Sequence, residues 1–248
     1  MNLLTQNALV LILAVGLDRF LPEPPHRFHP VVWMGRLITA LEVRTPKAPA
    51  SALIYGAMVV VVVVGIFGCG AWWAMTTLEA WGEVAHVLGG ALLMRTTFAT
   101  RALSTAANRT RRALAEDRLD DARDSLRNLV SRDPTVLDRS LIAAAAIESV
   151  AENTTDSFVG PWLAFAVLGV PAAVAYRAIN TLDSMLGYRG AYEYLGKTSA
   201  RLDDLVNLIP ARLSAVLLLA SGALAGLPAR LGRRTGGSSA LGRMVSRS

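Results

Sequence analysis

Three carboxylates and one amide stand close together at the end of an apolar stretch in the middle of the chain. Glu148 and Glu152 are four residues apart, so a helix places them on one face, which Asp156 extends if the helix continues. Carboxylates this close repel one another unless a cation, a base or a proton intervenes. We predict a catalytic cluster of Glu148, Glu152, Asn153 and Asp156, with Glu148, Glu152 and Asp156 as oxygen ligands of a metal ion such as Mg²⁺. The alternative is a helix end solvated at a membrane surface.

A second polar group follows at three-residue spacing. Arg177, Asn180 and Asp183 share one stripe of a short helix, while Ile179 and Leu182 lie on another side. The stripe suits a substrate-binding surface. The same spacing is also typical of an amphipathic helix lying at a membrane surface, so both interpretations stay open.

The segment 187–212 carries glycines, tyrosines and charged residues. Its Gly-Lys-Thr sequence is not a P-loop, because Ala191 stands where that motif requires glycine. Residues 187–198 can contact phosphate or a flat ring system, or they can be a membrane-surface loop. The charges at 201–212 either cap the last apolar span or line a polar pocket at its mouth, and Pro210 among them should kink or break the helix. The candidate substrate-binding residues here are Tyr188, Lys197, Arg201, Asp203, Asp204, Asn207 and Arg212.

Helical apolar segments must position these residues. A bilayer core of about 30 Å needs about 20 apolar residues in a helix. Uncharged segments at 3–17, 48–78, 84–94, 157–176 and 213–229 are the candidates, and 48–78 is the strongest. Gly160, Pro161, Gly169 and Pro171 interrupt the fourth, so it is either broken or re-entrant. We predict an all-α, polytopic membrane domain over 1–230 with four to five spans, and a disordered tail at 231–248.

Residues 95–156 form the main polar segment of this domain. Leu119, Ala122, Leu126 and Leu129 recur at helical spacing, which predicts an amphipathic helix. Asp133 followed by Pro134 is typical of a helix start, so the apolar helix that carries the carboxylates is predicted over 134–153.

Composition agrees with a membrane protein. Apolar residues make up 53% of the chain and charged residues only 18%, whereas soluble domains carry about 25% charged residues. The net charge of +6 suits contact with anionic lipid headgroups, so we expect lipid rather than nucleic acid as the partner of the basic residues. The chain has no HExxH, CxxC or GxSxG pattern, which leaves zinc and hydrolase chemistry without support.

Four ordered stretches resemble the CobD/CbiB family. They are HPVVWMGRLI (29–38), ESVAENTTDSFVGP (148–161) with Arg132-Asp133-Pro134 ahead of it, YRAINTLDSMLGY (176–188) and ARLDDLVNLIPARL (200–213). The resemblance implies a multi-pass enzyme of the cell (inner) membrane that acts in cobalamin (vitamin B12) biosynthesis. It also implies a longer C-terminal part with a Ser-Pro-Asn-Ala-Gly-Trp motif, so we expect this chain to be a shortened form.

The resemblance further implies a reaction. The family joins adenosylcobyric acid to aminopropanol, or to its O-phosphate, through an amide bond, and ATP with Mg²⁺ is expected to drive the step. The corrinoid, the amine and other cobalamin-pathway enzymes are the implied partners. Arg36, Lys197, Arg201 and Arg212 are then expected to neutralise phosphate, Tyr188 and Tyr194 to pack on the corrinoid or nucleotide, and His29 to bind substrate. A membrane transporter and a non-catalytic scaffold of the pathway remain the alternatives.

Overall fold

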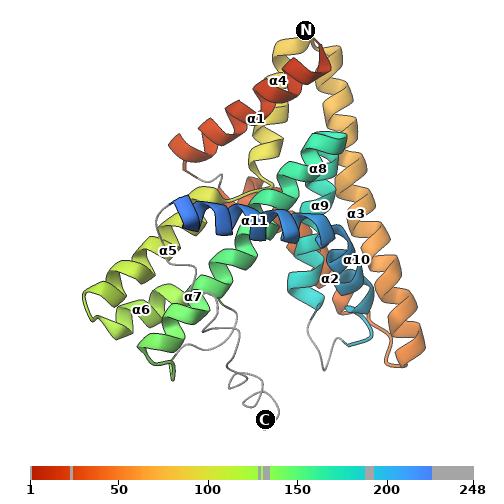
Figure 1. Ribbon diagram of the computed structural model, residues 1–248. Coiled ribbons are helices and arrows are strands. Elements are labelled where there is room, and N and C mark those ends of the chain that lie inside the picture. Colours follow the sequence, from red (N-terminus) through yellow and green to blue (C-terminus); the bar gives the residue numbers. More distant parts are fainter. Residues whose placement is uncertain (1, 23–24, 128–129, 131–134, 188–192, 225–248) are drawn as a thin grey trace.

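The computed structural model describes residues 2–22, 25–127, 130, 135–187 and 193–224, and within these ranges the chain is helical without any strand (Figure 1). The all-α expectation is therefore confirmed. The α-helices are α1 (Leu3–Phe20), α2 (Pro30–Glu42), α3 (Pro49–Ala80), α4 (Glu83–Arg95), α5 (Thr100–Ala115), α6 (Leu119–Leu126), α7 (Arg139–Thr154), α8 (Gly160–Leu168), α9 (Val170–Leu186), α10 (Lys197–Val206) and α11 (Leu208–Leu224). Two shorter elements, η1 (His26–Phe28, 3₁₀) and η2 (Thr155–Val159, π-helix), complete the set.

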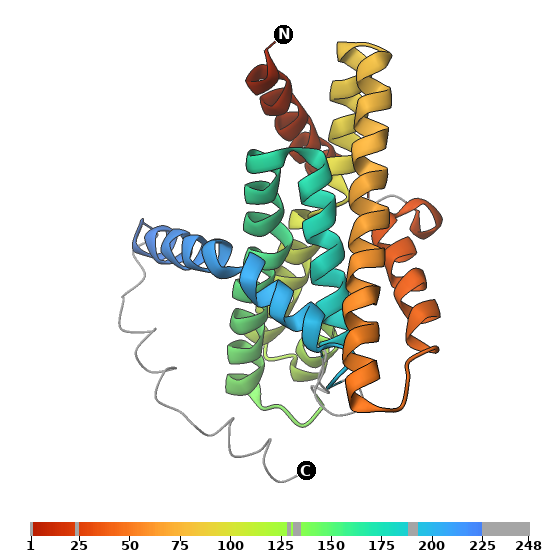
Figure 2. The same cartoon turned by 90° about the vertical axis from the view of Figure 1, so that its right-hand side faces the viewer.

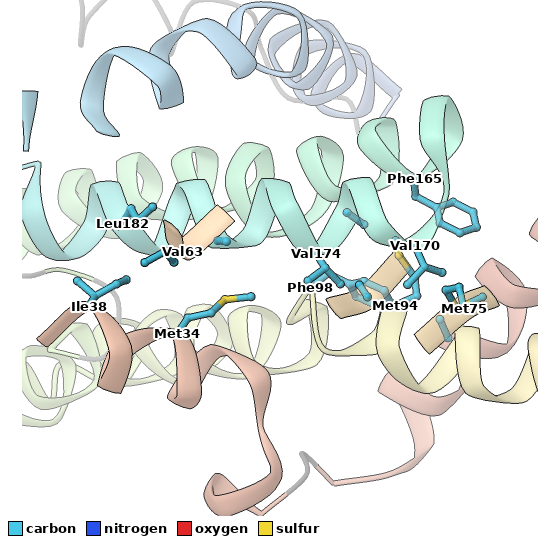
Figure 3. Close-up of a cluster of buried hydrophobic side chains, with 14 of the residues drawn as sticks. Met34, Ile38, Val63, Met75, Met94, Phe98, Phe165, Val170, Val174 and Leu182 are labelled. Carbon is cyan, nitrogen blue, oxygen red and sulfur yellow. The ribbon is translucent and has the colours of Figure 1, made fainter. Parts of the chain in front are cut away.

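The larger core lies between α3 and α9, the two helices at the centre of the bundle. Apolar side chains from α2, α4 and α8 close around them, including Met34, Met94 and Phe165 (Figure 3). α1 packs on α4 and extends this core at one end. The bundle is therefore held by burial of apolar surface between helices that are distant in sequence.

The polar segment folds as a separate small layer of α5, α6 and α7 (Figure 1). Its own core contains Ala113, Leu126 and Ile142. α6 buries Ala122 and Leu126, as the helical spacing of the sequence predicts, whereas Leu129 lies outside the described residues. α7 is shared between the two parts of the molecule, because it leaves this layer and leads into η2 and α8.

The helix carrying the carboxylates begins later than the sequence predicts. α7 starts at Arg139, and the side chain of Asp138 accepts a hydrogen bond from the amide of Leu141 at 2.9 Å. Asp138 is thus the N-cap, and residues 135–138 are not helical. The predicted start at Pro134 is wrong, since a second aspartate five residues downstream provides the cap; Asp133 and Pro134 themselves lie outside the described residues.

Among the described helices, α3 alone is long and apolar enough to cross a membrane by itself. It has 32 residues, and only 28% of its most apolar window is buried by the rest of the protein. An apolar helix left so uncovered suits lipid better than water. α10 and α11 pass the same test only when they are taken together as a span bent by 52°. The four to five spans predicted from the sequence stay a prediction; α4, at 13 residues, is about 20 Å long.

The predicted interruption of 157–176 is confirmed. The chain reverses at Gly169, where φ is +76°, and α8 and α9 pack side by side as a helical hairpin (Figure 2). Glycine adopts this left-handed backbone without steric cost, so it can form the turn. The hairpin returns the chain so that the start of α9 lies beside the end of α8 and its middle lies beside η2.

The last two helices bend at Asn207. α10 ends at Val206 and α11 begins at Leu208, so the break lies three residues before Pro210, where the sequence predicts a kink or break. Proline is tolerated in the first turn of a helix because its missing N–H has no helical partner there. α11 then crosses the bundle and extends beyond it, with most of its leucines exposed (Figures 1 and 2).

Candidate functional site

A polar pocket of about 460 Å³ opens between α7, η2 and α9. We call it the α7–α9 pocket. One wall carries Glu148, Glu152 and Asn153 of α7, and η2 adds Asp156. The facing wall of α9 carries Arg177, Asn180 and Asp183. The structure thus brings together the whole predicted catalytic cluster and the whole predicted stripe, which α8 and the first turns of α9 separate in sequence.

A π-helical turn positions Asp156 in this pocket. The amide of Gly160 bonds back to the carbonyl of Thr155, five residues earlier, instead of to the fourth residue. Such turns widen a helix by one residue and are frequent at functional sites. The helix therefore continues past Thr154, as the sequence argument required, but in a wider form that carries Asp156 and Ser157 to the pocket wall.

Arg177 has hydrogen-bonding capacity left over. Its Nη1 donates to Oγ of Ser157 at 3.2 Å and to Oδ1 of Asn180 at 3.4 Å. Its Nε is buried and donates to no described group. A guanidinium binds carboxylate or phosphate in a forked geometry. An anionic ligand in the pocket can therefore accept a hydrogen bond from the Nε–H of Arg177, which has no acceptor among the described residues.

Two of the pocket carboxyls hold their protons more tightly than usual. Burial raises the pKa of Asp156 to about 7, and the charges of Asp203 and Glu152 add to the effect. Burial also raises the pKa of Asp183 to about 6, with further contributions from Asp203, Asp204 and Glu152. An aspartate with a pKa near neutrality can take up and release a proton at physiological pH, which is the property of a general base.

The described residues of the pocket do not form a metal site with three protein ligands. No three His, Cys, Asp or Glu side chains in the described part of the chain are grouped so that they could hold a metal ion together. Glu152 and Asp156 are nevertheless close enough for the charge of one to affect the other. Mg²⁺ is commonly held by one or two carboxylates, with water and substrate phosphates completing the shell. The residues present fit that kind of metal binding.

A second polar network adjoins the pocket. The hydroxyl of Tyr176 donates to Oδ1 of Asn207, and Nδ2 of Asn207 donates to Oδ2 of Asp203 at 2.8 Å. This network connects α9 to α10 and to the bend before α11. Asp203 and Asn207 are therefore beside the site although they do not line the pocket itself.

Comparison with known proteins identifies the family. The sequence profile described as "CobD/Cbib protein" matches residues 11–243. The chain belongs to the CobD/CbiB family. Its relatives include the protein named "Cobalamin biosynthesis protein CobD" of Dehalococcoides mccartyi (strain CBDB1), which is 40% identical over 212 residues, covering 85% of this chain and 69% of that protein.

Further CobD relatives show the same degree of similarity. The protein of that name from Geobacter metallireducens is 40% identical over 92% of this chain and 72% of its own length. A "Probable cobalamin biosynthesis protein CobD" from Pyrococcus abyssi is 40% identical over 87% of this chain and 72% of its own length. No solved structure matches. The chain is thus a member of a cobalamin biosynthesis family.

The CobD/CbiB stretches contribute unequally to the site. The stretches 148–161 and 176–188 supply the α7–α9 pocket, and 200–213 supplies the adjoining network. The stretch 29–38 forms α2, which packs on α9 away from the pocket lining. His29 caps this helix, its Nδ1 accepting from the amide of Val31 at 3.3 Å. A role of His29 in substrate binding stays a prediction.

The basic residues expected to neutralise phosphate lie outside the pocket lining. Arg36 and Lys197 are exposed. Nη1 of Arg201 lies 3.9 Å from Oδ2 of Asp204 on the same helix, α10. Nη1 of Arg212 donates to the carbonyl of Leu208 on its own helix, α11. Their proposed roles remain untested. Tyr194 is 44% exposed, and Tyr188 lies outside the described residues.

Sequence reasoning missed some of the pocket lining. Ser149, Ser157, Ser184 and Gly187 belong to it. Ser157 accepts a hydrogen bond from Arg177, which is one of the predicted site residues. Its place next to Asp156 in the chain is the signal from which its position in the site could have been predicted. The hydrogen bond between Tyr176 and Asn207 had no comparable signal, because it joins α9 to the bend after α10 and the sequence does not place these two parts together.

Proposed function

We propose that this chain forms the amide bond between adenosylcobyric acid and aminopropanol or aminopropanol O-phosphate, yielding adenosylcobinamide or its phosphate. The supporting observation is a single pocket in which Asp156, with a pKa of about 7, lies across from the partly unsatisfied Arg177. The pocket combines a proton acceptor with an anion-binding group. Membership of a cobalamin biosynthesis family supports the choice of reactants.

Asp156 is the proposed base. An amine attacks an activated carboxyl carbon through its lone pair, so it must lose a proton as the N–C bond forms and the bond from carbon to the leaving group breaks. The carboxylate of Asp156 takes that proton. Its elevated pKa makes it a better acceptor than an ordinary aspartate at the same pH.

Arg177 and its neighbours are the proposed positioning groups. The guanidinium binds the substrate's phosphate or carboxylate through the unused Nε donor, while the amides of Asn153 and Asn180 line the walls for hydrogen bonding. A pocket of about 460 Å³ accommodates the reacting carboxyl arm and the amine. The corrinoid ring then lies across the pocket mouth rather than inside it.

Mg²⁺ and ATP are the proposed co-reactants. ATP would supply the activated form of the carboxyl group, and Mg²⁺ would neutralise the phosphates. Glu152 and Glu148, one turn before it, would hold the metal with the phosphate oxygens, directly or through water, while Asp156 keeps the role of base.

The proposal is tested with membranes that contain the full chain, supplied with adenosylcobyric acid, aminopropanol phosphate, ATP and Mg²⁺. Asp156→Asn keeps the shape but removes the base, and it should lower the rate of product formation by about 100-fold or more. Asp124→Asn, an exposed carboxylate on α6, is the matched control and should leave the rate unchanged. If Asp156→Asn and Asp124→Asn formed product at the same rate, Asp156 would not be the base of the reaction.

The same assay separates the alternative functions. Product formation by the wild type supports the enzyme. Accumulation of corrinoid in sealed vesicles without product supports a transporter, and neither result supports a scaffold. A multi-pass location in the cell (inner) membrane is part of the proposal, and the apolar, poorly covered α3 supports it.

A further inference from the structure

Away from the α7–α9 pocket, the end of α1 and the outer face of α5 enclose a strongly basic groove. It has a volume of about 460 Å³ and is lined by Arg19 of α1 and by Arg101, Arg109 and Arg112 of α5, with Ser104 and Asn108 between them. No acidic side chain is among the described residues that line it. We call it the α1–α5 groove.

The arginines of this groove lack compensating charges. Arg19, Arg109 and Arg112 form no ion pair within the described part of the chain. The acidic groups beside the groove are already engaged: Asp18 accepts hydrogen bonds from Thr100 and from the amide of Arg101, while Asp121 and Asp124 pair with Arg118 and Arg127. Four guanidinium groups around one hollow repel one another, and a bound anion relieves that repulsion.

The groove is built on a fixed junction of three helices. Asp18, which is 5% exposed, accepts hydrogen bonds from Thr100 and from the amide of Arg101, so a carboxylate of α1 caps the start of α5. The buried Arg95 at the end of α4 donates to the carbonyls of Leu21 and Pro22. Arg101 also donates to the carbonyl of Leu21 at 3.3 Å. These bonds hold Arg19 and the α5 arginines on the same side of the junction.

The groove continues into a more apolar surface. A second hollow of about 450 Å³ shares Arg101, Thr105 and Arg109 with it and adds Leu21, Pro22, Ala102 and Ala106, together with Asp18, which is only 5% exposed. Beyond it, α1 exposes Ile12 and Phe20, which are 67% and 80% accessible. A basic hollow beside an exposed apolar helix matches a molecule that has an anionic head and an apolar tail.

We propose that the α1–α5 groove binds the phosphate headgroup of an anionic phospholipid, with the acyl chains lying along the exposed face of α1. Arginine clusters at the boundary between apolar helices and polar segments recognise such headgroups through charge and forked hydrogen bonds. A soluble phosphate ester offers the same head without the tail and would leave the apolar part of the surface unused.

The test uses the full chain purified in a neutral detergent. It is titrated with short-chain phosphatidylglycerol, with short-chain phosphatidylcholine and with glycerol phosphate, and the shift of the thermal midpoint gives an apparent Kd. We expect phosphatidylglycerol to bind most tightly. Glycerol phosphate binding as tightly as phosphatidylglycerol would overturn the lipid assignment, as would equal binding of the two lipids.

Matched variants locate the site. Arg109→Gln with Arg112→Gln should weaken phosphatidylglycerol binding by about tenfold or more, because two headgroup contacts are lost. Arg44→Gln with Lys47→Gln removes the same net charge from an exposed loop and should change the Kd by less than about twofold. If both pairs weaken binding equally, or the groove pair does not weaken it, the lipid is not held in this groove.

Discussion

The hydroxyl of Tyr176 donates a hydrogen bond to Oδ1 of Asn207 over 2.5 Å, joining the middle of α9 to the bend between α10 and α11. Tyr176 is 5% exposed, and its ring lies against Gly160, where an added Cβ would stand 2.1 Å from the hydroxyl oxygen. The bond therefore connects the hairpin that forms the pocket with the last two described helices.

Tyr176→Phe should weaken this connection. It leaves Oδ1 of Asn207 without its donor, which should cost about 1 kcal/mol of stability or somewhat more. Thermal unfolding in detergent measures the effect. Tyr194→Phe, at an exposed site, is the control and should leave the thermal midpoint unchanged. A Tyr176→Phe protein as stable as the wild type would show that the bond contributes nothing to the fold.

Glu152→Ala should abolish amide formation while the protein still inserts into membranes. The side chain lines the α7–α9 pocket and raises the pKa of Asp156, so its removal changes both the proposed metal site and the proposed base. Glu79→Ala, an exposed carboxylate near the end of α3, should keep activity. Retained product formation by Glu152→Ala would exclude Glu152 from the site.

The pocket carboxyls should make the protein more stable in mild acid. An unfolded aspartate has a pKa of about 3.9, while folding raises that of Asp156 to about 7 and that of Asp183 to about 6. Between these values the folded state binds more protons than the unfolded state, so stability falls as the pH rises from about 4 to about 7. The thermal midpoint should therefore rise when the pH is lowered from about 8 to about 5.5.

Asp156→Asn tests the source of this pH dependence. The variant cannot ionise, so it should be more stable than the wild type at about pH 8 and should show a shallower dependence on pH. Asp120→Asn, whose carboxylate is 94% exposed, is the control and should keep the wild-type slope. An unchanged slope in Asp156→Asn would mean that other groups control the effect.

Gly56→Ala should destabilise the bundle. A Cβ at Gly56 would stand 2.1 Å from the carbonyl oxygen of Leu195, a backbone atom that cannot move aside easily. We expect a loss of about 1–3 kcal/mol, read as a lower thermal midpoint. Gly65→Ala on the same helix meets nothing within 4 Å and should stabilise the protein by up to about 1 kcal/mol. Similar responses of the two variants would contradict the close approach of α3 to Leu195.

The local parts of this structure were predictable, whereas the pairing of distant helices was not. Spacing alone placed Glu148 and Glu152 on one face of a helix and Arg177 with Asn180 on another, because side chains one turn apart share a face. Spacing does not say which helices pack together. The meeting of these two faces depends on the reversal at Gly169, and the sequence left it open whether that segment crosses, breaks or returns.

The position of the basic residues was likewise predictable within one helix but not between helices. Arg101, Arg109 and Arg112 recur on one face of α5, a pattern visible in the sequence, but their shared hollow requires Arg19 from α1. That partnership depends on the buried Asp18 capping a helix more than 80 residues away in the chain. Conversely, the family resemblance implies that Arg36, Lys197, Arg201 and Arg212 neutralise phosphate, yet packing does not bring them to the lining of the α7–α9 pocket.

The π-helical turn at Thr155–Val159 limits how this protein can change its length over evolutionary time. Because a π-turn takes in one residue more than an ordinary turn, deleting one residue there would restore an α-helix and leave α7 and α8 in nearly the same relative orientation. The wide turn that carries Asp156 and Ser157 to the pocket wall would then be lost. Such a deletion should be tolerated by the fold but not by the site, so the extra residue is itself an inherited part of the site.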